Sequence, residues 1–193
     1  MSATTARFFI ALLPSQAIQD EVTAIKQVFV DRYNSRAALR SPPHITLQPP
    51  FEWSLEAIAG LSETLREFAV QTLPIPVALS GFGAFAPRVI YIHVIKSAPL
   101  LTLQTVLATH LETSLGIVDA VGKARSFTPH MTVGFRDLTK ENFKLAWAEF
   151  QHCPFEVEWL ATHLTLLQHD GHRWTVHTEF PFASCETASH SDK

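Results

Sequence analysis

The stretch Ser41-Pro42-Pro43-His44-Ile45-Thr46-Leu47-Gln48-Pro49-Pro50-Phe51 organises the rest of this chain. Its centre is the word His-x-Thr followed by an apolar residue, and a proline directly precedes the histidine. Ile, Thr and Leu favour strands, whose side chains alternate between two faces. His44 and Thr46 are therefore predicted to share one face, while Ile45 and Leu47 anchor the opposite face in a core.

The same word returns in residues 127–135, FTPHMTVGF, where His130 and Thr132 take the two polar places. A third His-x-Thr word begins at His163, but no proline precedes it and no helical pattern follows it. We therefore interpret His163 as part of a strand in a C-terminal hairpin, and His44 and His130 as the functional pair.

Two such words resemble the 2H phosphoesterase superfamily, and within it the 2'-5' RNA ligase and RNA 2',3'-cyclic phosphodiesterase family. The resemblance covers residues 7 to 182. It implies an α+β fold of two pseudo-symmetric lobes, each an antiparallel sheet with flanking helices, around a central cleft. One motif strand from each lobe would line that cleft. Residues 1–183 are expected to form this single bilobal domain, and residues 184–193 a flexible polar tail.

Hydrophobic periodicity predicts the elements between the motifs. The first motif strand is expected to stop at Pro49-Pro50, because proline cannot donate to a sheet ladder. Helices are predicted over 15–34, 55–73, 100–115 and 140–150. Strands are predicted over 7–13, 38–40, 77–85, 89–95, 155–167 and 174–182, the last two joined through Asp170-Gly171.

Composition limits the class of protein. The chain has 193 residues, of which 47% are hydrophobic, enough for one compact domain with a sizeable core. No stretch near the N-terminus is long and apolar enough for a signal peptide or a membrane span. The two cysteines have no metal or redox spacing. We expect a monomeric, cytoplasmic protein with no membrane partner.

Charge is unevenly distributed, although the net charge is −3. Residues 32–51 hold Arg32, Arg36 and Arg40 and no acidic residue, and residues 120–136 hold Lys123, Arg125 and Arg136 and again none. Both motifs thus lie in basic windows of an acidic protein. This pattern favours a local phosphate ligand over a long nucleic-acid tract.

Two histidines across a cleft can exchange protons in opposite directions near neutral pH. We expect His44 to protonate the leaving ribose oxygen of a cyclic phosphodiester and His130 to activate water, with the reverse division left open. Thr46 and Thr132 would bind non-bridging phosphate oxygens. This scheme requires no cofactor and no metal. Run backwards with an RNA 5'-hydroxyl, it would form a 2'-5' bond.

Other residues around the motifs are secondary candidates. Related enzymes often carry arginine five residues after the second motif histidine, where this chain has Phe135, a candidate for stacking on a base. Arg136 is a weaker phosphate candidate because one step along a strand reverses the face. Arg125 is a better one. Phe51 and Tyr91 are further candidates for stacking, but each is more typical of a core residue. His169, His172 and His177 form a weak alternative metal site.

The substrate is left open between several classes. RNA ends or small nucleotides with a 2',3'-cyclic phosphate are the leading expectation. The alternatives are 2'-5'-linked oligoadenylate, ADP-ribose 1'',2''-cyclic phosphate, or a nucleotide-binding or RNA-end-binding protein without turnover.

Overall fold

The computed structural model describes residues 4–119 and 126–184, which form two four-stranded antiparallel sheets. The first sheet has the order β2 (Ile45–Ser54), β1 (Thr5–Leu12), β7 (His163–His169) and β8 (Trp174–Pro181). The second has the order β5 (His130–Gly134), β4 (Val89–Val94), β3 (Ile75–Phe85) and β6 (Glu156–Ala161). The expected α+β architecture of two lobes is confirmed.

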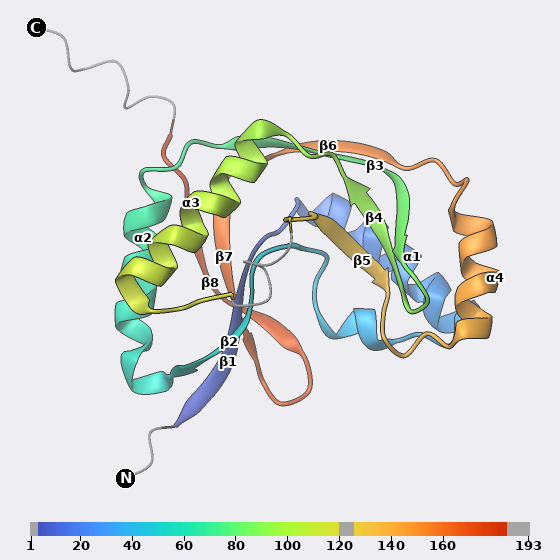
Figure 1. The fold of residues 1–193 in the computed structure, drawn as a ribbon, viewed down its shortest axis with the longest axis horizontal. Helices are drawn as coiled ribbons and strands as arrows, with labels where there is room; N and C mark the ends of the chain where they lie inside the picture. The colour runs from blue at the N-terminus through green and yellow to red at the C-terminus, as the bar shows by residue number, and fades with distance from the viewer. Residues whose placement is uncertain (1–3, 120–125, 185–193) are drawn as a thin grey trace, which may run out of the picture.

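Each sheet is covered by helices on one side (Figure 1). Helices α2 (Ile58–Ala69) and α3 (Ala98–Leu115) pack together beside the first sheet, whereas α1 (Gln16–Tyr33) and α4 (Lys140–Phe150) pack together beside the second. Helix α1 follows β1 in the chain, yet it contacts β5 of the other sheet. The chain therefore passes from the first lobe to the second directly after β1, and α1 connects the two lobes.

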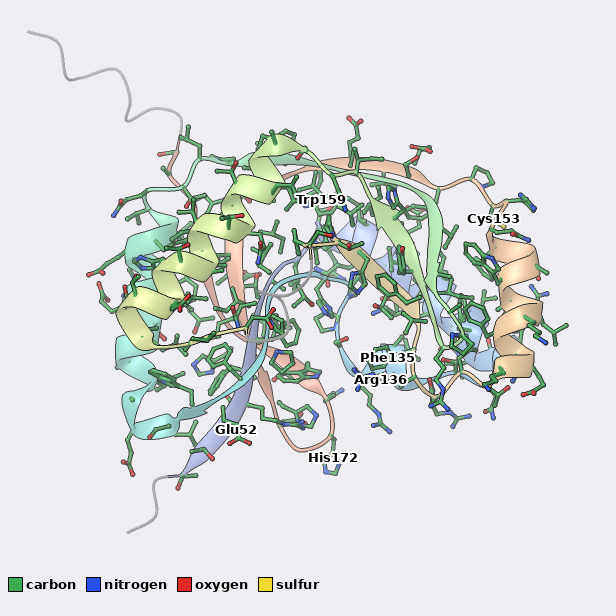
Figure 2. All side chains as sticks on the ribbon, in the orientation of Figure 1. Glu52, Phe135, Arg136, Cys153, Trp159 and His172 are labelled. Carbon is green, nitrogen blue, oxygen red and sulfur yellow. The ribbon has the colours of Figure 1, made fainter. Side chains whose placement is uncertain are left out.

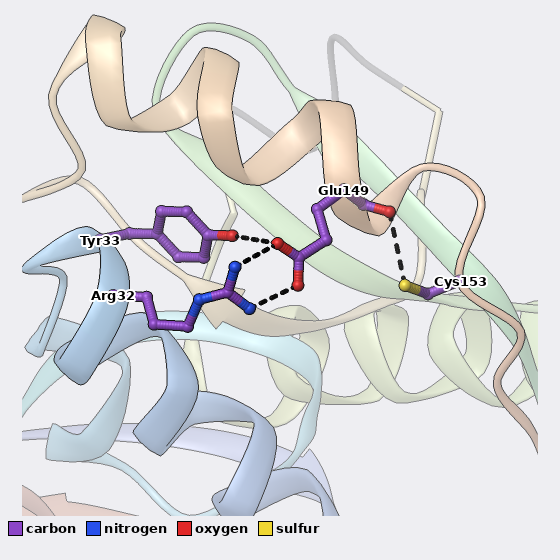
Figure 3. Close-up of polar contacts among 4 residues, drawn as sticks. All are labelled: Arg32, Tyr33, Glu149 and Cys153. Atoms are coloured by element: carbon purple, nitrogen blue, oxygen red, sulfur yellow. Dashed lines mark hydrogen bonds and ion pairs between the residues drawn. The ribbon is translucent and has the colours of Figure 1, made fainter.

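A polar cluster joins the ends of α1 and α4 (Figure 3). Arg32 donates two hydrogen bonds of 2.6 Å to the two carboxylate oxygens of Glu149, and the Tyr33 hydroxyl donates a third of 2.8 Å. The side chains of Arg32 and Glu149 are 54% and 39% exposed, so this ion pair contributes little stability by itself. Tyr33 is 5% exposed and adds its ring to the core next to Phe29.

The short strand predicted over 38–40 is wrong, because residues Ala37–Arg40 form a 3-10 helix. Its first turn is held from outside: the backbone N–H groups of Arg36 and Ala37 donate to one carboxylate oxygen of Asp137, at 2.7 and 2.8 Å. A carboxylate that accepts orphan N–H groups stabilises a helical start. Asp137 is a hundred residues away, so local sequence could not reveal it.

The prediction that Pro49-Pro50 ends the first motif strand is also wrong, since β2 continues to Ser54. Among the described strands, β2 lies at the edge of its sheet and pairs only with β1. The pairing passes from Phe8↔Phe51 to Ile10↔Gln48, so the two prolines fall at a register shift. An edge strand tolerates missing donors at such an irregularity.

The strand predicted over 155–167 is in fact two strands that belong to different sheets. β6 pairs with β3 in the second sheet, and after Thr162 the chain enters β7 of the first. Thirteen residues exceed the usual length of one strand. The helix predicted over 55–73 is likewise divided, into a 3-10 turn (Leu55–Ala57) and α2. The predicted hairpins β3–β4 and β7–β8 and the helix over 140–150 are confirmed.

Within residues 4–119 and 126–184, no helix is both long and apolar enough to span a bilayer. Most of the tail predicted over 184–193 lies outside the described residues.

Candidate active site

The two motif strands meet at the junction of the lobes. β2 and β5 are edge strands of the two sheets, and they contact each other. The alternation predicted from sequence holds in both: Ile45, Leu47, Met131 and Val133 are at most 2% exposed in the core. His44, Thr46, His130 and Thr132 instead line one cleft of about 420 Å³. The structure thus brings together four residues that lie up to 88 positions apart (132 − 44).

The two imidazoles are oriented by the same kind of hydrogen bond to a nearby backbone carbonyl. Nδ1 of His44 lies 2.7 Å from the carbonyl oxygen of Pro42, and Nδ1 of His130 lies 2.8 Å from that of Thr128. A carbonyl can only accept, so Nδ1 carries the proton in each ring. Nε2 is therefore the nitrogen left for proton exchange with a ligand. In both motifs the carbonyl belongs to the residue two places before the histidine.

Aromatic rings support both histidines. The Phe9 ring lies 4.7 Å from that of His44, between centroids, and the rings of Phe85 and Tyr91 lie 5.0 and 5.3 Å from that of His130. Tyr91 is 8% exposed, as expected for a core residue, and it does not line the cleft itself. These contacts restrict how far either imidazole can rotate.

Both histidines are electrostatically biased towards the neutral form. Burial lowers the pKa of His44 to about 4; the hydrogen bond to Pro42 opposes this shift, and the charges of Lys26 and His130 add to it. Burial also lowers the pKa of His130, against the opposing hydrogen bond to Thr128. Part of each ring remains open to the cleft. A bound phosphate anion would raise both pKa values because it favours the imidazolium.

The cleft is positively charged. Arg7, Arg40 and Arg136 line it, and no aspartate or glutamate is among its described lining residues. Arg40 and Arg136 come from the two basic windows seen in the sequence. Arg7 lies on β1, which pairs with the motif strand β2, and it was not predicted because local sequence does not show which strands pair. Such a lining suits a phosphate ligand.

An aromatic residue of each lobe reaches the cleft. Phe135 lines it as predicted, and Arg136 does too, because β5 ends at Gly134 and the strand alternation no longer applies (Figure 2). The Arg136 guanidinium carbon lies 5.3 Å from the Phe135 ring centroid. From the first sheet comes Trp174, whose ring has Arg7 at 5.7 Å. Sequence reasoning missed Trp174, which carries no local signal.

The other candidates that the structure describes are not part of the cleft lining. Arg125 is outside the described residues. Phe51 packs against Phe8 and Trp53 and does not line the cleft. His163 is exposed on β7, with Nδ1 2.8 Å from Thr162 Oγ1, and it is not part of the cleft lining either.

The histidines of the last hairpin make contacts of other kinds. Nδ1 of His169 accepts a hydrogen bond of 3.1 Å from Arg7, and Nδ1 of His177 lies 3.1 Å from the side-chain oxygen of Gln168. In the described part of the chain, no group of three or more His, Cys, Asp or Glu residues is placed to hold a metal ion. The alternative metal site at His169, His172 and His177 is therefore not supported.

Comparisons with known proteins identify relatives of this chain. A family model described as the 2'-5' RNA ligase superfamily matches residues 14–173. A Geobacillus thermodenitrificans protein named "Putative phosphoesterase" is 33% identical over 186 residues, covering 94% of this chain and 99% of its own. An Oceanobacillus iheyensis protein with a similar name is 30% identical, covering 90% and 96%.

Solved structures share the fold. E. coli LigT complexed with 3'-AMP superposes with a TM-score of 0.69 at 20% identity, over 94% of this chain and all of that one. TT0787 of Thermus thermophilus superposes with a TM-score of 0.66 at 22% identity, over 91% and 97%. At these identities the likeness establishes the architecture, and the chemistry has to come from the residues of the cleft.

Proposed function

Because this chain belongs to the 2'-5' RNA ligase superfamily, we propose that it is a phosphoesterase that hydrolyses 2',3'-cyclic phosphate ends of RNA or small nucleotides. One observation carries the proposal. Two imidazoles from different lobes, each fixed with its proton on Nδ1, line one basic cleft together with two threonine side chains. Opening a cyclic phosphodiester requires a base and an acid on opposite sides of phosphorus.

The reaction follows from that placement. Nε2 of one histidine takes a proton from water as the water oxygen bonds to phosphorus. Nε2 of the other, protonated, histidine donates its proton to the ribose oxygen as the phosphorus–oxygen bond breaks. Thr46 and Thr132 donate hydrogen bonds to the non-bridging oxygens, and the three arginines stabilise their charge. With an RNA 5'-hydroxyl and the reverse steps, the same groups would join two ends.

The electrostatics of the free protein favour the reverse of the division expected from sequence. A general base must start neutral, and burial lowers the pKa of His44 to about 4. The pKa of His130 is also lowered, but its ring is less deeply buried. His130 therefore takes up the proton of a general acid at a lower cost than His44 does. His130 would then protonate the ribose oxygen, and His44 would activate water. Single-histidine variants can decide between these divisions.

The aromatic residues support a nucleotide as the ligand. Phe135 and Trp174 come from different lobes and line the same cleft, each with an arginine beside its ring. Stacking of a base on an aromatic side chain contributes about 1–3 kcal/mol. The related LigT was solved with 3'-AMP, which provides a ligand to test here.

The experiment is a turnover assay in EDTA on four 2',3'-cyclic mononucleotides and on RNA oligomers with a cyclic phosphate end. 2'-5'-Oligoadenylate and ADP-ribose 1'',2''-cyclic phosphate complete the panel. We expect metal-independent opening of the 2',3'-cyclic phosphates, and loss of that activity in His44→Ala and His130→Ala. His163→Ala is the matched control and should change turnover by less than about tenfold, or 1.4 kcal/mol of barrier.

Three outcomes would contradict the proposal. Turnover of only the last two substrates would assign the alternative activity. Activity lost in EDTA and restored by zinc would refute the metal-free scheme. Tight binding of 3'-AMP with no turnover of any substrate would indicate a binding protein.

A further inference from the structure

Lys26 is a buried cation directly behind the cleft. It lies on α1 and is 2% exposed, which is unusual for lysine. Its Nζ donates a hydrogen bond of 3.0 Å to the carbonyl oxygen of Ser41. Among the described residues, no carboxylate forms an ion pair with it. Burying an unpaired ammonium group costs free energy, so its position here indicates a role that offsets this cost.

The contact is made to the turn that carries the first histidine. Ser41 and His44 line the cleft, whereas Lys26 does not, so the ammonium lies behind the wall that Ser41 forms. The next carbonyl along the chain, that of Pro42, accepts the proton of His44 Nδ1. Lys26 therefore fixes the carbonyl adjacent to the one that sets the tautomer and orientation of the imidazole.

We propose that Lys26 is a positioning residue of the phosphate site, which holds the Ser41–His44 turn and adds a fixed positive charge behind it. This inference rests on the proposed function and adds a residue that does not touch the substrate. The turn ends in two prolines before His44, and their missing N–H groups leave it few backbone donors of its own. An external donor from α1 supplies that support.

The charge of Lys26 acts on His44 as well as on a ligand. Burial lowers the pKa of Lys26 to about 8, so the ammonium is still mostly charged at neutral pH. Its charge disfavours the imidazolium of His44, as does that of His130. Among the described residues, Lys26 and His130 are the groups whose charges lower the pKa of His44, and three arginines, Arg7, Arg40 and Arg136, line the same cleft. A neutral His44 beside a positive potential suits a site that binds an anion and activates water.

The test compares Lys26→Met, which keeps the shape and removes the charge, with Lys26→Arg, which keeps the charge. Lys144→Met is the matched control, because Lys144 is exposed on α4. We expect Lys26→Met to lower kcat/KM by about tenfold to a hundredfold, the range for a catalytic group displaced by up to ~1 Å. The pH titration of His44, followed by NMR, should move to higher pH in Lys26→Met and stay in place in the other two variants.

Two readouts do not depend on turnover, so failure of the proposed function and failure of this inference can be told apart. Affinity for inorganic phosphate should fall in Lys26→Met, and the His44 resonance of the wild-type protein should show a second inflection near pH 8. The measurement of this second inflection needs no variant, so it tests the inference even if Lys26→Met does not fold. An unmoved His44 titration with unchanged phosphate affinity, or equal losses in Lys26→Met and Lys26→Arg, would overturn the inference.

Discussion

Ser35 Oγ donates a hydrogen bond of 2.7 Å to a carboxylate oxygen of Asp137, and this contact ties the two sides of the cleft together. Ser35 leads into the 3-10 helix that carries Arg40, and Asp137 follows Phe135 and Arg136. The same hydroxyl accepts a hydrogen bond of 3.3 Å from the backbone N–H of Phe135. The two basic segments are thus positioned by a contact outside the cleft.

Asp137→Asn should destabilise the protein by about 1 kcal/mol, the net worth of an exposed hydrogen-bonded carboxylate. Burial acts to raise the pKa of Asp137, but hydrogen bonds from Ser35, Arg36 and Ala37 outweigh it and lower the pKa. The stabilisation is therefore present above the unfolded pKa of about 3.9 and is lost as the pH falls through the folded value. Urea unfolding at pH 7 and pH 3 checks this, and an equal difference at both would contradict it.

His44→Ala and His130→Ala should each remove most turnover, and the double variant should lose much less than the product of the two losses. An acid and a base that share one reaction act as a unit. Residual activity assigns the roles: if His44 is the base, His44→Ala retains only an acid and its rate falls with rising pH. His130→Ala should then show a rate that rises with pH. Fully multiplicative losses would mean that the histidines do not cooperate.

The pH profile of kcat/KM should be bell-shaped with both limbs below pH 6.5, the lower one near pH 4. This follows because kcat/KM reports the free protein, in which burial lowers the pKa of both histidines. Binding of a phosphate ester raises the pKa values of both histidines, so the two limbs of the kcat profile should lie at higher pH. If the limbs of the kcat/KM profile lay at or above pH 6.5, water in the cleft would be offsetting the effect of burial on the two pKa values.

The lowered pKa of His44 also predicts acid sensitivity of the fold. The unfolded chain takes up a proton near pH 6.5 and the folded one only near 4, so stability falls with the pH across that window. Because part of the ring stays open to cleft water, the loss should be about 1–3 kcal/mol. His44→Ala should therefore lose less stability than the wild type between pH 7 and pH 4 in urea unfolding. Parallel losses would indicate that other groups cause the effect.

Gly83→Ala should disturb the site through Tyr91. A Cβ at Gly83 would lie 2.7 Å from the Tyr91 hydroxyl oxygen, and the Tyr91 ring supports His130. We expect a destabilisation of roughly 1–3 kcal/mol, typical of overpacking, together with lower kcat. Gly60→Ala is the control, because its Cβ would meet nothing within 4 Å. It should stabilise by up to about 1 kcal/mol. Thermal unfolding and turnover of both variants check this pair.

The sequence by itself determined the pair of motifs and their faces. Proline before His44 and before His130, with alternating apolar residues behind them, was enough to predict two strands with one polar face each. That inference is local, because strand alternation depends only on neighbouring residues. Helix α4 and the hairpin β3–β4 were predictable for the same reason, and the helix predicted over 100–115 ends where Gly116 adopts a φ of 67°, a conformation that glycine reaches easily.

Only the tertiary structure decided which strands share a sheet and what reaches the cleft. Residues 155–167 have the pattern of one strand, yet they divide between two sheets, because β3 pairs with their first part and β1 with their second. Arg7, Trp174 and Lys26 carry no motif, and long-range packing alone brings them to His44. The helical form of residues 37–40 depends on Asp137 in the same way. Such contacts are set by how whole elements pack, and a local pattern contains no information about them.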